Sequence, residues 1–279
     1  MKTITITKSA GFCFGVRRAL QLAEQTATAN KKVYMLGDIV HNPRVVKDIK
    51  KTGVIKIDKL RPQHNGVLLI RAHGEPRNIY KMAEKLGYKI IDATCPMVKE
   101  IHSIAREYEQ KKFTIIIIGD RKHDEVIGIR GNLENDPIII AQKKEITAEK
   151  FARISKAAIV VQSTQNIDKV LDIVEKLEKH IKKVIFCNTI CLPTRLKQQE
   201  IQQLPATQDM MIIIGAKTSA NTKRLYELSK KINPNTYWVN SKNDIRKSWF
   251  KHKEKIGIGA GASTPEYIIK EIASYIRSI

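Results

Sequence analysis

The spacing of three cysteines is the feature that most constrains the fold of this chain. Cys13, Cys95 and Cys191 divide its 279 residues into three parts of similar length. A glycine stands 24 residues after each cysteine, and each glycine ends an apolar run typical of a buried strand. These glycines are Gly37, Gly119 and Gly215. A recurrence of this kind predicts an internal repeat of three structural units.

The remainder of each third repeats the same order of segments. A polar residue stands four positions after each glycine, and a second apolar run ending in a polar turn follows it. Helix-period segments come after these turns, most clearly from Val170 and from Tyr267. The polar residues are His41, His123 and Ser219. Strands that alternate with helices predict parallel α/β sheets.

The segment before each cysteine completes the pattern. Apolar residues lead into Cys95 and Cys191, whereas Cys13 is preceded by the alternating segment Thr3–Thr7 and the chain ends in a predicted helix. We therefore expect the N-terminal strand to complete the third unit. The predicted fold class is α/β, with three small units of mostly parallel sheet in a pseudo-threefold arrangement around a central site. The predicted domains are residues 13–95, 96–190 and 191–279, with residues 1–12 completing the third.

The cysteines and the polar residues of the repeat all follow predicted strand ends. Ligands gather at that edge of parallel α/β sheets, and the pseudo-symmetry directs the three edges towards one axis. The cysteines also precede predicted helices, whose N-terminal ends favour a negatively charged sulfur ligand. Three convergent cysteines fit zinc with a histidine, or an iron–sulfur cluster. Dispersed single cysteines lack the paired spacing of a structural zinc site. In a four-iron cluster, three thiolates leave one iron open to a substrate oxygen.

A fourth cysteine competes for the third ligand position. Cys191 matches the other two in its distance to the following glycine, whereas Cys187 falls within a predicted strand. We therefore predict that Cys191 is the ligand and that Cys187 is a core residue.

Charge and hydropathy exclude some classes of protein. The 50 Lys and Arg residues against 28 Asp and Glu give a net charge of +22, spread along the whole chain. This charge fits an anionic small molecule, an acidic protein partner, nucleic acid, or a lysine-rich surface without a partner. Aromatic residues make up 6% of the chain and no base-stacking motif is present, so no nucleic-acid partner is expected.

No apolar run approaches the roughly 20 residues of a membrane helix, and no apolar signal segment is present. We therefore expect no membrane partner and a cytoplasmic location.

Short segments along nearly the whole chain carry a resemblance to a known family. In chain order they are Gly11–Val16, Val40–Asn42, Arg71–Gly74, Asp92–Pro96, His123–Val126, Gln162–Thr164, Asn188–Cys191, Ser219–Asn221 and Gly259–Ser263. In these segments the chain resembles the 4-hydroxy-3-methylbut-2-enyl diphosphate reductase family, whose members catalyse the last step of the non-mevalonate isoprenoid pathway.

The resemblance implies a cofactor and a reaction. The cofactor is one oxygen-sensitive 4Fe–4S cluster with three cysteine ligands, Cys13, Cys95 and Cys191, and one open iron that takes the allylic alcohol of the substrate. The reaction is a two-electron, two-proton reductive dehydroxylation of (E)-4-hydroxy-3-methylbut-2-enyl diphosphate to isopentenyl diphosphate and dimethylallyl diphosphate. An acidic electron donor such as ferredoxin or flavodoxin is the expected protein partner of this basic chain.

The resemblance also implies roles for individual residues. Glu125 matches the carboxylate that delivers a proton, and His123 and Ser163 belong to the same network. The expected substrate-binding residues are His41, His73, His123, Ser163, Thr164, Ser219, Asn221 and Ser263. Imidazoles, hydroxyls and an amide are the donors that a diphosphate requires.

Three departures from the family pattern and two alternatives accompany this interpretation. Ala220 replaces a serine, Ser163 replaces a threonine and keeps the hydroxyl, and Asp124 replaces a proline and adds a negative charge beside Glu125. Ser263 begins a sequence typical of a helix cap and could serve only as a cap. The alternative function is a zinc-binding or thiol-redox protein without isoprenoid chemistry.

Overall fold

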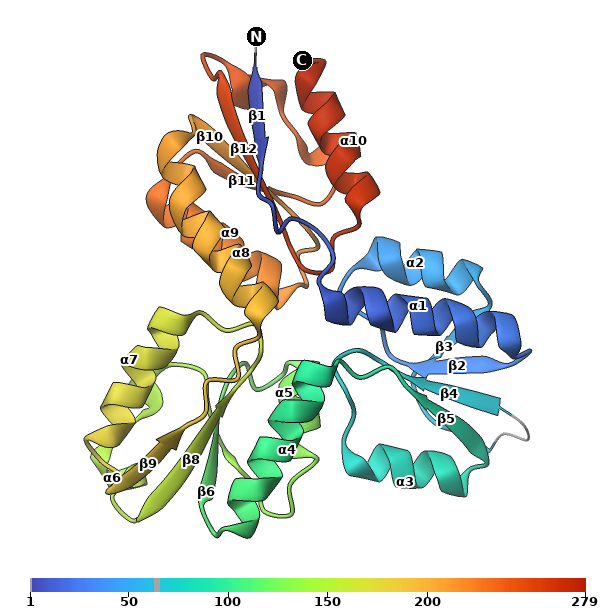
Figure 1. Ribbon diagram of the computed structural model, residues 1–279, viewed down its shortest axis with the longest axis vertical. Helices are drawn as coiled ribbons and strands as arrows, with labels where there is room; N and C mark the ends of the chain where they lie inside the picture. Colours follow the sequence, from blue (N-terminus) through green and yellow to red (C-terminus); the bar gives the residue numbers. More distant parts are fainter. Residues whose placement is uncertain (1, 63–65) are drawn as a thin grey trace. The chain divides into compact units, whose positions relative to one another are not determined.

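The computed structural model describes residues 2–62 and 66–279 (Figure 1). Within these residues the chain forms three four-stranded sheets, and every pairing of neighbouring strands is parallel. The predicted α/β class with parallel sheets is confirmed. The pseudo-threefold relation between the units stays a prediction.

The strands of each sheet are contiguous in the chain, apart from β1. The first sheet has the order β3-β2-β4-β5, the second β7-β6-β8-β9 and the third β1-β12-β10-β11. Their bounds are β1 Thr3–Ile6, β2 Val33–Leu36, β3 Val54–Ile57, β4 Gly66–Ile70, β5 Tyr88–Asp92, β6 Thr114–Ile118, β7 Ile138–Ile140, β8 Lys156–Val161, β9 Lys183–Phe186, β10 Met210–Ile214, β11 Thr236–Val239 and β12 Lys255–Ala260.

Helices lie in most of the connections between strands, as is typical of parallel sheets. They are α1 Phe14–Ala29, α2 Pro43–Lys51, α3 Arg77–Lys85, α4 Pro96–Gln110, α5 Asp124–Arg130, α6 Ala148–Phe151, α7 Ile167–Glu178, α8 Leu192–Gln203, α9 Ala220–Ile232 and α10 Glu266–Arg277. Short 3₁₀ turns cover Lys143–Glu145, Leu204–Thr207, Lys242–Asp244 and Lys247–Phe250. No helix in the described part of the chain has both the length and the apolar character needed to cross a membrane.

The chain is divided into two compact units. Unit 1 comprises Met1–Arg17, Val40–Asp48 and Leu192–Ile279, and unit 2 comprises Arg18–Ile39 and Ile49–Cys191. Unit 1 contains the third sheet, and unit 2 contains the first and second sheets. The three predicted domains each supply the strands of one sheet, and the division at residues 95/96 and 190/191 stays a prediction.

The N-terminal strand lies at the edge of the third sheet, next to β12. The register pairs Thr3 with Lys255 and Ile6 with Ile258. Strand β1 is therefore held by residues that come near the end of the chain, and the loop after it leads directly into Cys13 and α1.

Apolar side chains cover both faces of the sheets, which explains the uninterrupted apolar runs in the sequence. In the second sheet, α7 packs Val170, Ile173, Val174 and Leu177 against one face, and residues of α4 and α5 cover the other. In the third sheet, α10 covers one face, and Ile201 of α8 with Leu225 of α9 covers the other. With both faces of these sheets buried, the polar side chains of the predicted site lie in the turns and helix starts that follow the carboxyl ends of the strands.

Candidate functional site

Each predicted site residue follows the end of a parallel strand, and the residues form two groups, one in each compact unit. Unit 2 carries Cys95, Cys191, His73, His123, Glu125, Ser163 and Thr164. Unit 1 carries Cys13, His41, Ser219, Asn221 and Ser263.

Cys95 lies between β5 and α4, where the backbone and a charged side chain fix it. Its N–H donates to the carbonyl of Ala72 at 3.0 Å, in the turn that follows β4. The Asp92 carboxylate accepts from the Thr94 N–H at 2.9 Å and lies 2.5 Å from Lys99 Nζ. Burial raises the pKa of Asp92, but the bonds from Lys99 and Thr94 outweigh it and lower that pKa overall. Asp92 thus stays charged and holds the segment that ends in Cys95.

His73 lies in the tight turn after β4. Gly74 has φ +77°, and a Cβ there would come within 3.1 Å of His102 and of Thr94, so only glycine permits this turn. Burial lowers the pKa of His102 to about 4, so its ring stays neutral near pH 7 beneath the turn. The His73 ring meets the His123 ring edge to face, with centroids 5.6 Å apart. The turn therefore brings two predicted substrate-binding imidazoles together.

His123 caps α5 and thereby orients its own ring. Its Nδ1 accepts from the Glu125 N–H at 3.2 Å. In the neutral ring the hydrogen then lies on Nε2, which makes Nε2 a donor for an anion. This capping bond also places Glu125 in the first turn of the helix.

Glu125 is buried, with 2% of its surface exposed, and Ser163 contacts both of its carboxyl oxygens. The Ser163 N–H donates to Oε1 at 2.5 Å, and the Ser163 hydroxyl donates to Oε2 at 2.7 Å. The neighbouring Thr164 hydroxyl accepts from the Gln162 side chain at 3.1 Å. The pairing of Glu125 with Ser163 joins the end of β8 to the start of α5.

Arg71 joins the His73 turn to the start of α5, a role that the sequence did not reveal. Its Nε lies 2.6 Å from Glu75 and its Nη1 lies 2.7 Å from Asp124. Burial raises the pKa of Glu75, although Arg71 offsets part of that rise. Arg71 also balances the negative charge that Asp124 adds beside Glu125. The Arg71–Glu75 spacing of four was visible in the sequence, but the contact with Asp124 requires the fold.

Cys191 precedes α8 and is tied to the same serine. Its N–H donates to the Ser163 carbonyl at 3.1 Å. The Thr189 hydroxyl donates to the Val161 carbonyl at 2.6 Å and accepts from the Val161 N–H at 2.7 Å, so it holds the segment before Cys191 against the end of β8. Ser163 therefore connects Cys191 with Glu125.

Cys187 has different surroundings. It follows β9 directly, and its N–H donates to the Ile159 carbonyl at 2.9 Å. Its side chain packs against the core cluster that includes Ile101 and Ala105, and burial raises the pKa of its thiol. These contacts agree with a core role, and the choice of Cys191 over Cys187 as a ligand stays a prediction.

Cys13, in unit 1, lies against the turn that follows β12. Its N–H donates to the Ala262 carbonyl at 3.1 Å, and its sulfur accepts from the Val16 N–H at 3.5 Å in the first turn of α1. Gly11 has φ +94°, and a Cβ there would lie 3.2 Å from the Ile269 side chain. Glycine is thus required for the loop that leads into Cys13.

His41 and Ser263 also meet in unit 1. The Asn42 side chain donates to the Ser263 carbonyl at 2.7 Å, and the Ser263 hydroxyl lies 3.4 Å from the His41 carbonyl. The capping role considered for Ser263 is wrong, because Pro265 occupies the cap position of α10 and no side chain caps that helix.

Ser219 and Asn221 lie at the start of α9. The Ser219 hydroxyl caps the helix by accepting from the Thr222 N–H at 3.3 Å. Asn221 is 4% exposed, and neither atom of its amide has a hydrogen-bond partner among the described residues. A buried amide without a partner is costly, so this side chain points to a ligand that would satisfy it.

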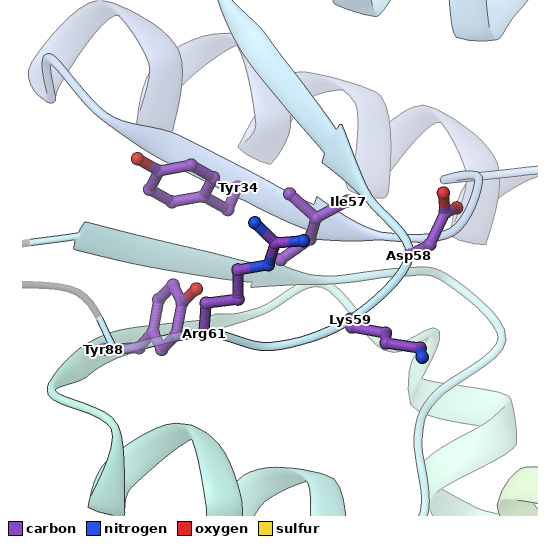
Figure 2. A pocket seen from close by; sticks show the side chains of 6 residues that line it. All are labelled: Tyr34, Ile57, Asp58, Lys59, Arg61 and Tyr88. Carbon is purple, nitrogen blue, oxygen red and sulfur yellow. The ribbon is translucent and has the colours of Figure 1, made fainter.

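A separate pocket of about 510 Å³ lies on the first sheet (Figure 2). It is lined by Tyr34, Ile57, Asp58, Lys59, Arg61 and Tyr88. None of these residues belongs to the predicted site, and the pocket has no part in the arrangement described above.

Comparison with known proteins identifies the family. Residues 4–277 match the family model of the LytB protein. The chain is 39% identical to the 4-hydroxy-3-methylbut-2-enyl diphosphate reductase of Aquifex aeolicus, with 100% of this chain and 97% of the relative covered. It is 38% identical to the enzyme of the same name from Clostridioides difficile, with 99% of each covered.

Solved structures agree with the sequence relatives. The structure of an (E)-4-hydroxy-3-methyl-but-2-enyl diphosphate reductase, described as the terminal enzyme of the non-mevalonate pathway, is 37% identical and matches with a TM-score of 0.73 over 100% of both chains. The Plasmodium falciparum reductase is 29% identical and matches with a TM-score of 0.89 over 99% of this chain and 87% of the other. These relatives do not favour the zinc-binding or thiol-redox alternative. The chain belongs to the LytB family of 4-hydroxy-3-methylbut-2-enyl diphosphate reductases, which are oxidoreductases.

Proposed function

We propose that this chain converts (E)-4-hydroxy-3-methylbut-2-enyl diphosphate to isopentenyl diphosphate and dimethylallyl diphosphate, using a 4Fe–4S cluster held by Cys13, Cys95 and Cys191. The substrate gains two electrons and two protons and loses its hydroxyl as water. The observation that carries the proposal is the double role of Ser163: it bonds both oxygens of Glu125 and accepts from the backbone of Cys191. A proton-carrying group and a cluster ligand are thereby fixed by one residue.

The three cysteines fit an iron–sulfur cluster. None of them is in a disulfide, each precedes a helix, and the N–H of each is bound to a carbonyl in a neighbouring strand-end turn. The sulfur of Cys13 also accepts a helix N–H, as a thiolate ligand would. When bound, the cluster would pass the two electrons one at a time from the external donor to the substrate, and its fourth iron would have no cysteine ligand.

The polar groups of both units supply donors for the diphosphate. His123 offers Nε2–H, since its Nδ1 is used in capping. Asn221 offers an amide that is otherwise unsatisfied among the described residues. His41, His73, Thr164, Ser219 and Ser263 complete the proposed set. Removing donors of this kind should weaken substrate binding more than it slows the chemical step.

Glu125 supplies a proton to the departing oxygen. It is buried and held at both oxygens, so its carboxyl group has a fixed direction and little contact with solvent. Hydroxide is a poor leaving group, and protonation by a positioned acid turns it into water. Ser163 orients the carboxyl group, and His123 fixes the helix turn that carries it.

The proposed electron donor is an acidic protein such as ferredoxin or flavodoxin. Phe14 and Leu192 immediately follow two of the proposed ligands, and they are 65% and 56% exposed. Exposed apolar side chains suit the centre of a transient interface, and the basic residues of this chain suit a rim that faces an acidic partner. The four cysteines, all within the described residues, form no disulfide, which suits a reducing compartment, so the proposal includes a cytoplasmic location.

Turnover with an acidic protein donor is expected to fall steeply with salt. Raising the ionic strength from about 0.01 to about 0.15 M shortens the screening length from ~30 to ~8 Å, so we expect the donor-dependent kcat/KM to drop by about tenfold or more. A small neutral reductant is the control, and its rate should change little. Equal salt sensitivity with both reductants would show that the charge of +22 does not serve donor docking.

The proposal is tested by purifying the chain anaerobically and measuring iron, sulfide, zinc and turnover. We expect about four irons and four sulfides per chain, together with water-forming conversion of the substrate to the two products. One zinc per chain without sulfide, and no conversion with any reductant, would support the alternative function instead.

A further inference from the structure

Lys197, on α8 in unit 1, has an unusual environment for a lysine. Only 3% of its surface is exposed. Its ammonium group donates to the carbonyl of Ser9 and, at 2.9 Å, to the carbonyl of Gly11. A buried charge is tolerated only when it is well hydrogen-bonded, and here the loop before Cys13 provides the bonds.

Glu200 reaches the same loop from the next turn of α8. Its Oε2 accepts from the Ser9 N–H at 3.1 Å and from the Ser9 hydroxyl at 2.8 Å. One helix thus binds both the donors and the acceptors of the loop. The loop needs such support because Gly11 has φ +94° and the bonding of β1 to β12 ends with the Thr7 N–H, which donates to the Ile258 carbonyl at 2.9 Å.

We propose that Lys197 is a positioning residue for Cys13, and that its buried positive charge raises the reduction potential of the cluster. The proposal deepens the function proposed above and rests on Cys13 being a ligand. Lys197 binds the carbonyl two residues before Cys13, so loss of the ammonium would free the backbone that orients the sulfur.

The effect on the potential follows from charge. Reduction adds one negative charge to the cluster, and a fixed positive charge nearby stabilises the reduced form. The interaction is strongest where water is excluded, as it is around this ammonium. An uncharged side chain of similar length at this position should therefore lower the potential.

Hydrogen exchange of the full-length chain, before and after cluster assembly, tests the positioning role. The N–H groups of Ser9, Ala10 and Cys13 are hydrogen-bonded, so their exchange reports opening of the loop. In Lys197→Met we expect them to exchange about 10- to 100-fold faster, the factor expected for lost charged hydrogen bonds. Lys197→Arg should stay close to the parent protein. Lys223→Met, at an exposed lysine of α9, is the matched control.

A redox titration of the loaded protein tests the electrostatic role. Lys197→Met should have a lower midpoint potential, whereas Lys197→Arg and Lys223→Met should keep that of the parent. Parent-like exchange and potential in Lys197→Met would overturn the proposal. Faster exchange with an unchanged potential would overturn its electrostatic part. The exchange measured before cluster assembly does not require iron, so a failure of the proposed function would be recognised separately by the metal analysis.

Discussion

Replacing Glu125 by glutamine is expected to slow single turnover by about 10²- to 10⁴-fold while leaving the cluster and substrate binding in place. The amide preserves size, and its oxygen can still accept from the Ser163 N–H that now contacts Oε1 at 2.5 Å. Its NH₂ group can donate to the Ser163 hydroxyl, which can rotate. The geometry is thus retained and the transferable proton is lost.

The measurements are iron content, substrate affinity and single-turnover rate under anaerobic conditions. His41→Ala is the comparison, because His41 is a proposed substrate donor and its loss should mainly weaken affinity. A single-turnover rate near that of the parent in Glu125→Gln would exclude Glu125 as the essential proton donor.

Cys191→Ser is expected to lose iron and to abolish turnover, as are Cys13→Ser and Cys95→Ser, because an oxygen ligand replaces a thiolate that the cluster requires. Cys187→Ser is the matched control, since it lies four residues from Cys191. Its side chain packs in the core and burial raises its pKa, so it should keep both iron and activity.

Iron and sulfide analysis with turnover assays on the four variants distinguishes the two assignments. Loss of the cluster in Cys187→Ser, with a retained cluster and activity in Cys191→Ser, would reverse the choice of the third ligand.

The sequence predicted the class of fold because the threefold repeat produces a regular spacing of glycines and apolar runs. The glycines at 37, 119 and 215 directly follow β2, β6 and β10, and the apolar runs before them are those strands. The helical periodicity from Val170 predicted the buried face of α7 correctly. These signals are local, and one-dimensional spacing is enough to detect them.

Contacts between distant segments left no such trace. In the sequence, Lys197 cannot be distinguished from any other helix lysine, and its contact with the loop at Ser9 depends on the tertiary structure. The contact of Arg71 with Asp124 depends on the tertiary structure in the same way. The residue types that follow Ser263 predicted that it caps a helix, but Pro265 occupies the cap position of α10. The contacts of Lys197 and Arg71 that support the site could therefore be identified only in the structure, whereas the residues predicted to take part in the reaction could be identified in the sequence.

The pairing of β1 with β12 has a consequence for biosynthesis. Strand β1 is translated long before its neighbour in the sheet, Lys255–Ala260. The carbonyl of Ala262, which accepts from the Cys13 N–H, emerges later still. Such distant pairing is slow to form and leaves an unpaired edge exposed in the meantime. A nascent chain thus lacks the hydrogen-bond partner of the Cys13 N–H until residue 262 has been translated, so the local structure around Cys13 can be completed only after that point.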